Sequence, residues 1–330
     1  MANFLNVSGI NYCGKEANEI FSKMIYDLDL ANSGITLRDN VKGKEKLYTG
    51  KVGDVWQAYT CPFTPSGEAS LAESFIEPAR IKVNMENCYD AFDNTYFVEQ
   101  TKIALDGGIP QTFSDWFFNE QLLPKMKKEY QEIFWKGDTA YVGETKKYLK
   151  VTDGIEKKLN NAEGVKKING TAFTVDNVLA QVEAAVVAAI NNANDLDVDT
   201  EDYVIFMNHS DVRLLEMALG KQSAQILTTS VFSNFYRQGE DIYVLGYKVV
   251  RTMQSRNSII VGPVRNIVLG YDTFDSHTEY KLIDMRETTG DNMFLVHSKI
   301  TLYSSANISF MWRRFILPSL ISFVVSTTQS

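Results

Sequence analysis

The chain has 330 residues, of which 45% are hydrophobic and 22% charged, which suits one or two folded domains with a substantial core. Its formal net charge of −8 argues against a protein that wraps nucleic acid with its folded surface, because such binding needs basic side chains that neutralise phosphates. An acidic surface would suit a container that must not adsorb DNA, and it would equally serve simply to keep the chain soluble. No apolar run approaches the ~20 residues of a membrane-spanning helix, and the N-terminus lacks the pattern of a signal peptide.

The first expected element is a helix over residues 16–31. Ile20, Met24 and Leu28 recur once per turn between charged residues, which is a narrow amphipathic stripe. The pattern fits an N-terminal arm and fits an ordinary surface helix equally well.

Residues 36–78 have no apolar periodicity of their own, and several Gly and Pro residues divide them into short β-like pieces. This pattern predicts an extended two-stranded loop. Trp56, Tyr59 and Phe63 have no obvious core partners within it, so we expect a neighbouring subunit to cover them. The alternative is a β-rich subdomain that folds back on its own chain. A compact enzyme rarely carries such a long unstructured segment, whereas a subunit that completes its folding against neighbours can.

Residues 79–85 alternate as a strand, and the Gly-Gly-Ile-Pro sequence at 107–110 predicts a break. A long amphipathic helix is expected over residues 113–135, with Thr112 or Ser114 as its cap. Pro124 lies inside it and should kink it or open it locally, because proline cannot donate its backbone hydrogen bond. Gly137 is expected to end the helix as a C-cap.

The middle of the chain predicts an α/β unit. A polar, lysine-rich surface excursion over 138–170 precedes a helix at 175–194 and a buried strand at 203–207. Asn208 then caps a short helix that ends at Leu219 before Gly220. The last third predicts a series of strands, at residues 242–245, 247–250, 259–261, 267–269, 280–285 and 294–302.

Catalytic and metal-binding patterns are scarce. His209, His277 and His297 are the only histidines, and none stands in a recognised nucleophile setting. The three cysteines, Cys13, Cys61 and Cys88, form no CxxC pair, and we expect folding in a reducing cytosol. The chain has no Walker loop and no dinucleotide-binding glycine motif.

The acidic run at residues 195–202 suggests a calcium loop but fails the template. Thr200 occupies the position of the required glycine, and Phe206 that of the bidentate glutamate. A solvated acidic loop is the default interpretation. We therefore expect no catalytic site, no cofactor site and no metal site.

The order of these elements resembles that of the tailed-bacteriophage major capsid proteins, from about residue 9 to residue 314. Trp-Lys-Gly-Asp at 135–138, followed by Asp-Gly-Ile at 153–155, is similar to the Gly-Asp at the family's helix end and its downstream Gly-Ile. Phe-Met-Asn at 206–208 and Leu-Gly-Tyr-Lys-Val-Val at 245–250 resemble the family's strand-to-helix and strand-turn sequences. Val-Gly-Pro at 261–263 stands where the family has a strand ending in Gly-Asp, and the lysine-rich 140–170 segment departs from the family's short loop.

The resemblance implies an α+β chain with the Hong Kong 97-like capsid fold. Its parts would be an N-terminal arm (1–35), an extended β-hairpin loop (36–78), a peripheral domain with a long spine helix (79–138), an α/β axial domain (139–285), and return strands of the peripheral domain with the C-terminus (286–330). The implied protein is no enzyme but a structural shell subunit.

By resemblance, the subunit would form the hexamers and pentamers of an icosahedral virion capsid that encloses double-stranded DNA without specific binding. Assembly would occur in the bacterial host cytoplasm, with scaffold, portal and decoration proteins as further partners, and without a membrane. Some members crosslink a loop lysine to an asparagine, but no partner asparagine is evident for Lys42, Lys44, Lys46 or Lys51. Two alternatives remain open: an encapsulin-like shell that holds cargo protein, and a soluble α/β metal-dependent enzyme that uses the acidic run.

Overall fold

The structure is a computed structural model. It describes residues 11–13, 34–38, 40–41, 43–52, 56–59, 61, 65, 69–76, 79, 81–109, 111–161, 165–195, 200–226, 235–238, 241–270, 279–286, 288–300, 307–308 and 322–325. The expected N-terminal arm helix at 16–31, as well as Phe63 and His277, lies outside these residues.

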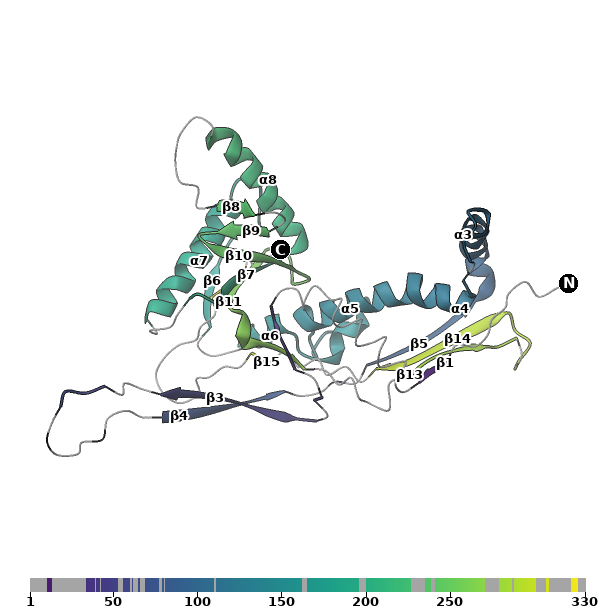
Figure 1. The fold of residues 1–330 in the computed structure, drawn as a ribbon, viewed down its shortest axis with the longest axis horizontal. Helices are drawn as coiled ribbons and strands as arrows, with labels where there is room; N and C mark the ends of the chain where they lie inside the picture. The colour runs from purple at the N-terminus through teal and green to yellow at the C-terminus, as the bar shows by residue number, and fades with distance from the viewer. Residues whose placement is uncertain are drawn as a thin grey trace.

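The first part of the fold, the peripheral lobe, packs an antiparallel sheet against a long helical segment (Figure 1). Within the described residues this peripheral sheet has the order β1-β13-β14-β5, with β1 (Asn11–Cys13), β5 (Ile81–Cys88), β13 (Glu279–Asp284) and β14 (Met293–Ile300). Its helical elements are η1 (Tyr89–Phe92), α3 (Asp93–Leu105), α4 (Phe113–Trp116), the π-helical turn η2 (Phe117–Leu122) and α5 (Leu123–Lys136).

The elements α4, η2 and α5 run on from one another, and together we call them the spine helix. Thr112 caps it: its hydroxyl accepts a hydrogen bond from the Asp115 N–H at 3.2 Å and donates to the Asp115 carboxylate at 2.7 Å. The buried apolar side chains follow the expected stripe: Phe113, Trp116, Phe117, Phe118, Leu122, Met126, Tyr130, Ile133, Phe134 and Trp135. The helix expected at 113–135 is therefore confirmed in its bounds, but its last part, from Tyr130 to Trp135, is buried on all sides rather than along one stripe.

Pro124 lies in the first turn of α5, directly after the π-helical turn. In this turn the Leu123 N–H bonds to the Phe118 carbonyl, five residues back rather than four. Proline lacks the N–H that would continue the regular ladder, and the helix opens locally just before it, in this wider turn. A bend at Pro124 that differs among copies of the chain stays a prediction.

The second part, the axial lobe, is a mixed sheet with two long helices, α7 (Val178–Asp195) and α8 (His209–Ile226). In the part of the chain that the structure describes, this axial sheet has the order β6-β16-β11-β7-β10-β9-β8. Its strands are β6 (Lys166–Asn169), β7 (Tyr203–Asn208), β8 (Phe235–Gln238), β9 (Asp241–Val244), β10 (Tyr247–Thr252), β11 (Ser258–Pro263) and β16 (Ser322–Val325). Strands β7 and β10 are parallel, whereas β11 runs antiparallel to β7.

Alternating residues of the axial sheet belong to two different cores. Ile205, Val249 and Ile259 face the core that α7 and α8 complete. Their chain neighbours Phe206, Val250 and Ile260 belong to the core of the spine helix and the peripheral sheet. Since successive side chains of a strand point to opposite faces, one sheet serves both cores. The two lobes are thus joined through a shared layer.

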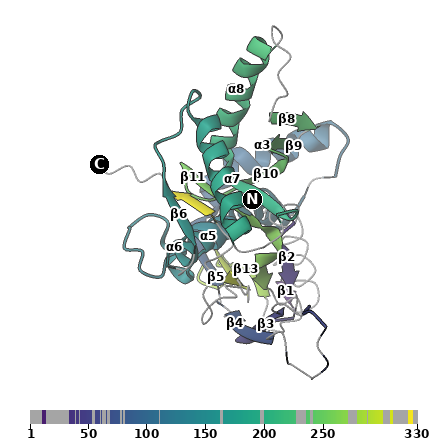
Figure 2. The ribbon, with the colours of Figure 1, turned by 90° about the vertical axis from the view of Figure 1, so that its left-hand side faces the viewer.

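A two-stranded hairpin extends away from both lobes (Figure 1). Its strands are β3 (Glu45–Val52) and β4 (Ala69–Ile76), which pair antiparallel from Glu45 with Ile76 to Val52 with Ala69. Figure 2 shows the hairpin at the opposite end of the molecule from helix α8. At its base, β2 (Thr36–Arg38) pairs with β12 (Ile267–Gly270), which also pairs with β15 (Asn307–Ile308).

The strand pairing divides the chain differently from the expected domain boundaries. Strand β13 forms a hairpin with β14 in the peripheral sheet, although residues up to 285 were expected in the axial domain. Strand β16 pairs with β11 in the axial sheet, within the 286–330 segment that was expected to supply return strands of the peripheral domain and the C-terminus. In both cases the strand belongs to the sheet in which its backbone N–H and C=O groups find partners, whatever its position along the chain.

Helix α8 continues past Gly220, where the sequence predicted that it would end. A Cβ placed on Gly220 would meet nothing within 4 Å, so this glycine has no packing role in the described structure. Its neighbours Leu215 and Ala218 are buried, and their packing outweighs the modest helix cost of one glycine.

Candidate functional site: the hairpin loop and the lobe junction

The aromatic residues predicted to contact a neighbour lie in the loop between β3 and β4. The side chains of Trp56 and Tyr59 are 94% and 93% exposed. Exposed aromatic rings of this size are candidates for burial in a protein contact. The third residue of the prediction, Phe63, lies outside the described residues.

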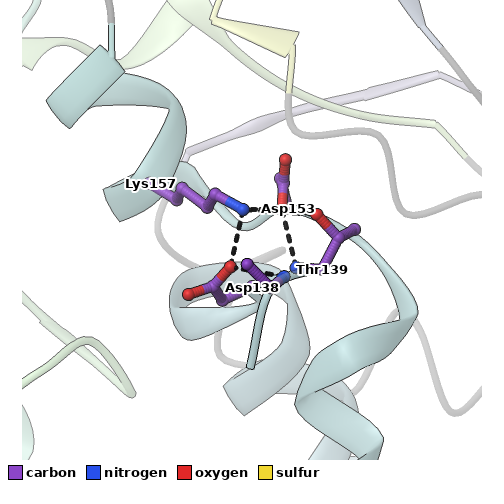
Figure 3. Close-up of polar contacts among 5 residues, drawn as sticks. Asp138, Thr139, Asp153 and Lys157 are labelled. Atoms are coloured by element: carbon purple, nitrogen blue, oxygen red, sulfur yellow. Dashed lines mark hydrogen bonds and ion pairs between the residues drawn. The ribbon is translucent and has the colours of Figure 1, made fainter. Parts of the chain in front are cut away.

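A second candidate site lies at the end of the spine helix, where the polar excursion after α5 returns to α6 (Ile155–Asn161). The ammonium group of Lys157 bonds to Asp138 at 2.6 Å and to Asp153 at 2.7 Å, and Asp153 also accepts the Thr139 N–H at 2.8 Å (Figure 3). We call these four residues the clamp. They hold the two ends of the excursion together.

Two glycines lie beneath the clamp in close backbone contact. Gly154 N–H donates to the Gly137 carbonyl at 2.8 Å, and a Cβ on Gly137 would lie 2.2 Å from the Thr152 carbonyl oxygen. Gly137 has φ −50°, so the helix does not end in the left-handed conformation that usually favours glycine at a C-cap. The expected position of the helix end is confirmed, but glycine is required there because the two backbones cross without room for a side chain.

The clamp has a charge pattern that predicts a dependence of stability on pH. Lys157 holds the pKa of Asp138 below its usual range, helped by the Ala140 N–H. Burial raises the pKa of Asp153, but hydrogen bonds from Lys157 and Thr139 outweigh it and lower the pKa overall. Because both carboxyl pKa values are lower in the folded chain, the clamp stabilises the fold above the ordinary carboxyl pKa of about 4 and loses this effect as the pH falls.

We therefore expect Lys157→Met to lower the melting temperature of the subunit at neutral pH, and the difference from the wild type to shrink as the pH falls from about 5 to 2. Lys147→Met is the matched control, since Lys147 is 77% exposed and its distance to Glu144 is 3.8 Å. Thermal melts across this pH range test the expectation. A deficit of Lys157→Met that stays constant with pH would contradict it.

The helix side of the excursion is held by a second polar group. Glu132 is buried on α5 and accepts hydrogen bonds from Lys146 at 2.9 Å and from the Tyr148 hydroxyl at 2.5 Å. Burial raises its pKa, but these two donors and the charge of Lys136 lower it overall. Two lysines of the polar excursion, Lys146 and Lys157, thus bind carboxylates that hold the excursion in place.

No sequence pattern indicated a role for the loop at residues 253–257, between β10 and β11. Both oxygens of the Glu156 carboxylate, on α6, accept hydrogen bonds from Ser255, one from its backbone N–H and one from its hydroxyl at 2.6 Å. Asn257 N–H bonds at 2.7 Å to Asp211, which is fully buried in the first turn of α8. Burial raises the pKa of Glu156, although the Ser255 hydrogen bonds and the charge of Lys136 oppose this shift. Burial likewise raises the pKa of Asp211, against the Asn257 hydrogen bond and the charge of Arg256. We call α6 and this loop the lobe junction.

The predicted helix cap at Asn208 is confirmed, since its side-chain oxygen accepts the Ser210 N–H at 2.9 Å. His209 is exposed at the start of α8, and His297 contacts Asn84 at 2.9 Å across the peripheral sheet.

Of the acidic run, residues 196–199 lie outside the described part of the chain. Glu201 and Asp202 line an open groove of about 820 Å³ together with Tyr243, Tyr247 and Arg265. Arg265 pairs with Asp202 at 2.5 Å. Among the described residues, no three His, Cys, Asp or Glu side chains gather where they could hold a metal ion, and no helix is long and apolar enough to cross a membrane.

Among known proteins, this chain is similar to solved structures only. No model of a protein family and no curated protein matches the sequence. A chain of the satellite phage P4 procapsid, solved with the size determination (Sid) protein, matches with a TM-score of 0.53 and 11% identity, over 93% of this chain and 89% of that one. A chain of the Myoviridae phage XM1 capsid matches with a TM-score of 0.51 and 11% identity, over 91% and 92% of the two chains.

A chain from the structure of Gordonia phage Cozz matches with a TM-score of 0.50 and 8% identity, over 92% of this chain and 87% of that one. At identities this low the likeness establishes the fold alone. It extends over at least 91% of this chain and at least 87% of each of the three others. The chain therefore has the phage capsid fold that its sequence resemblance predicted, the α+β Hong Kong 97-like fold.

Proposed function

We propose that this chain is the major capsid protein of a tailed bacteriophage. Copies of it assemble into hexamers and pentamers of an icosahedral shell around double-stranded DNA. One observation supports this above all others: a chain with the phage capsid fold extends a hairpin beyond its own lobes, with Trp56 and Tyr59 exposed in the hairpin loop.

The hairpin gives the subunit two different contact surfaces, its loop and whatever surface receives that loop on the next copy. Contacts between unlike surfaces run head to tail, and they close into rings when the rotation between copies permits. Each copy would then cover the aromatic rings of its neighbour. A protein that acts as a monomer would gain nothing from keeping two large rings in water.

The partners of the proposed protein follow from this role. It binds mainly copies of itself, and scaffold, portal and decoration proteins are further partners in the same assembly. It functions in the virion capsid after assembly in the cytoplasm of the bacterial host. It encloses DNA without specific binding, has a structural role and catalyses no reaction.

The nearest alternative is an encapsulin-like shell that holds cargo protein. A gene neighbourhood with portal and terminase genes would favour the phage capsid, whereas a neighbouring peroxidase or ferritin-like gene would favour the nanocompartment. A soluble metal-dependent enzyme is the alternative of a different class, and the described part of the acidic run offers it no support, because Asp202 is paired with Arg265.

Particle size tests the proposed function. The purified chain, expressed alone and together with its neighbouring genes, should elute at megadalton size and form closed shells in electron micrographs. A protein that stays a monomer or small oligomer under both conditions would contradict a shell function. DNA packaged within purified particles would separate a phage capsid from a cargo shell.

A further expectation concerns binding of DNA by free subunits. With a net charge of −8, the unassembled chain should show no measurable binding to duplex DNA at ~150 mM salt, since nonspecific affinity requires many phosphate contacts. A gel-shift titration measures this directly. Submicromolar affinity would instead indicate a nucleoprotein whose basic groups are clustered by the fold.

A further inference from the structure

The two lobes meet through an apolar contact that does not fix their relative angle by itself. Trp135, at the end of the spine helix, packs against Phe206 of the axial sheet with ring centroids 5.5 Å apart. Val250 and Ile260 lie in the same core. Apolar contact of this kind is non-directional, and its strength depends on buried area. It holds the lobes together but sets their relative angle less sharply than directional hydrogen bonds do.

The bond between Glu156 and Ser255 is directional. The two carboxylate oxygens of Glu156 each accept one donor of the same residue, the backbone N–H and the hydroxyl of Ser255. Two parallel hydrogen bonds to one charged group fix both distance and orientation. A rotation of the loop relative to α6 would lengthen or misalign at least one of the two bonds.

On the spine side, Glu156 is attached to a rigid base. The preceding Gly154 is in backbone contact with Gly137 and has no room for a Cβ, which would lie 2.6 Å from the Gly137 nitrogen. The following Lys157 bonds to Asp138 and Asp153 (Figure 3). The start of α6 therefore moves with the spine helix.

On the axial side, Ser255 is held just as firmly. The buried side-chain amide of Gln254 donates to the Phe206 carbonyl at 3.2 Å and to the Ser258 carbonyl at 2.6 Å. Asn257 bonds to Asp211 through its N–H, and its side-chain oxygen accepts the Phe173 N–H at 2.8 Å. The loop therefore moves with the axial lobe.

From these observations we infer that Glu156 and Ser255 are positioning residues that set the angle between the spine helix and the axial lobe. This inference rests on the proposed function, because in a shell the shape of one subunit determines the curvature of the whole. A small change of angle, repeated in every copy, changes the diameter at which the shell closes. The Glu156–Ser255 pair would thus act on shell size without contacting any neighbour.

The test uses the full chain with Glu156→Gln, with Ser255→Ala, and with both changes. Glu156→Gln keeps the shape of the side chain but places an amide NH₂ against one of the two donors. Ser255→Ala removes the hydroxyl and keeps the backbone bond. Glu144→Gln is the matched control, because the Glu144 side chain is 95% exposed.

Electron microscopy of the assembled particles should show a second size class, or unclosed sheets, for both single variants. The wild type and Glu144→Gln should give one diameter. The double variant should be no more heterogeneous than the worse single variant, since both changes remove the same link.

Unchanged diameters in both single variants would overturn the inference, even if their melting temperatures or yields fell, because a merely stabilising pair affects yield and not size. Absence of shells in the wild type would instead contradict the proposed function. If Glu156→Gln fails to fold, Ser255→Ala alone decides the question, since it leaves the charge of Glu156 and the backbone bond in place.

Discussion

Replacing Trp56 by alanine is expected to prevent shell assembly at protein concentrations at which the wild type assembles. A buried aromatic anchor contributes about 2 kcal/mol or more to a protein contact, which is roughly a 30-fold change in each pairwise association constant. A closed shell repeats the contact in every subunit, so the losses combine. Tyr59→Ala should weaken assembly in the same direction.

The unassembled Trp56→Ala subunit should melt at nearly the same temperature as the wild type. Its side chain is 94% exposed, so the folded subunit loses little burial when the indole is removed. Val142→Ala is the control, because Val142 is also 94% exposed but lies in the excursion rather than in the hairpin. Light scattering during assembly and thermal melts of free subunits give the two measurements.

The opposite pattern would show that the hairpin loop belongs to a self-contained core. In that case Trp56→Ala would lower the melting temperature of the free subunit and leave assembly intact. If Val142→Ala lost assembly to the same extent, the assembly measurement would not distinguish the hairpin loop from other exposed surface.

Gly154→Ala is expected to destabilise the folded subunit by about 3 kcal/mol, the upper part of the usual range for inserting atoms into a packed site. The added Cβ would lie 2.6 Å from the Gly137 nitrogen and 2.7 Å from the Trp135 carbonyl oxygen. Backbone atoms cannot swing aside as the end of a side chain can. The two chain segments would have to move apart where they cross. This movement would break the Gly154–Gly137 hydrogen bond and disrupt the clamp.

Gly220→Ala is the matched control for this change. Gly220 is an exposed residue of helix α8 with nothing within 4 Å of a built Cβ, so alanine should stabilise the chain by about 0.5–1 kcal/mol. Urea denaturation of the two variants and the wild type compares all three free energies of unfolding. A neutral Gly154→Ala would show that the backbone crossing is looser than the structure indicates.

The sequence predicted best those elements whose buried faces follow a regular period. The spine helix, strand β7 and the hairpin of β9 and β10 all lie close to the predicted positions. In each of them, apolar spacing and local turn residues agree with the final packing.

Helix α3 was missed for a physical reason. Its buried positions include the polar Gln100 beside Tyr96, whereas the apolar Leu105 is 80% exposed. The helix is held partly by polar bonds, such as that from the Trp116 ring nitrogen to Glu99 at 2.6 Å. Apolar periodicity cannot reveal a helix that packs in this way.

Of the two candidate sites, one could be predicted from the sequence and the other could not. The exposed aromatics of the hairpin loop could be proposed from sequence, because rings without local partners need a contact elsewhere. The lobe junction could not be proposed from sequence, because Glu156 and Ser255 are 99 residues apart in the chain. Nothing in the pattern around either residue indicates the other, and only the fold brings them together.

The sharing of the axial sheet between two cores has a consequence for how the chain unfolds. Phe206 and Ile205 are adjacent in one strand, yet each is buried in a different core. Melting either core removes one face of the sheet and leaves large apolar side chains in water on that side. Neither lobe can therefore persist for long once the other is lost, and heating should produce one cooperative transition rather than two. A mutation that destabilises one lobe should then unfold the entire subunit.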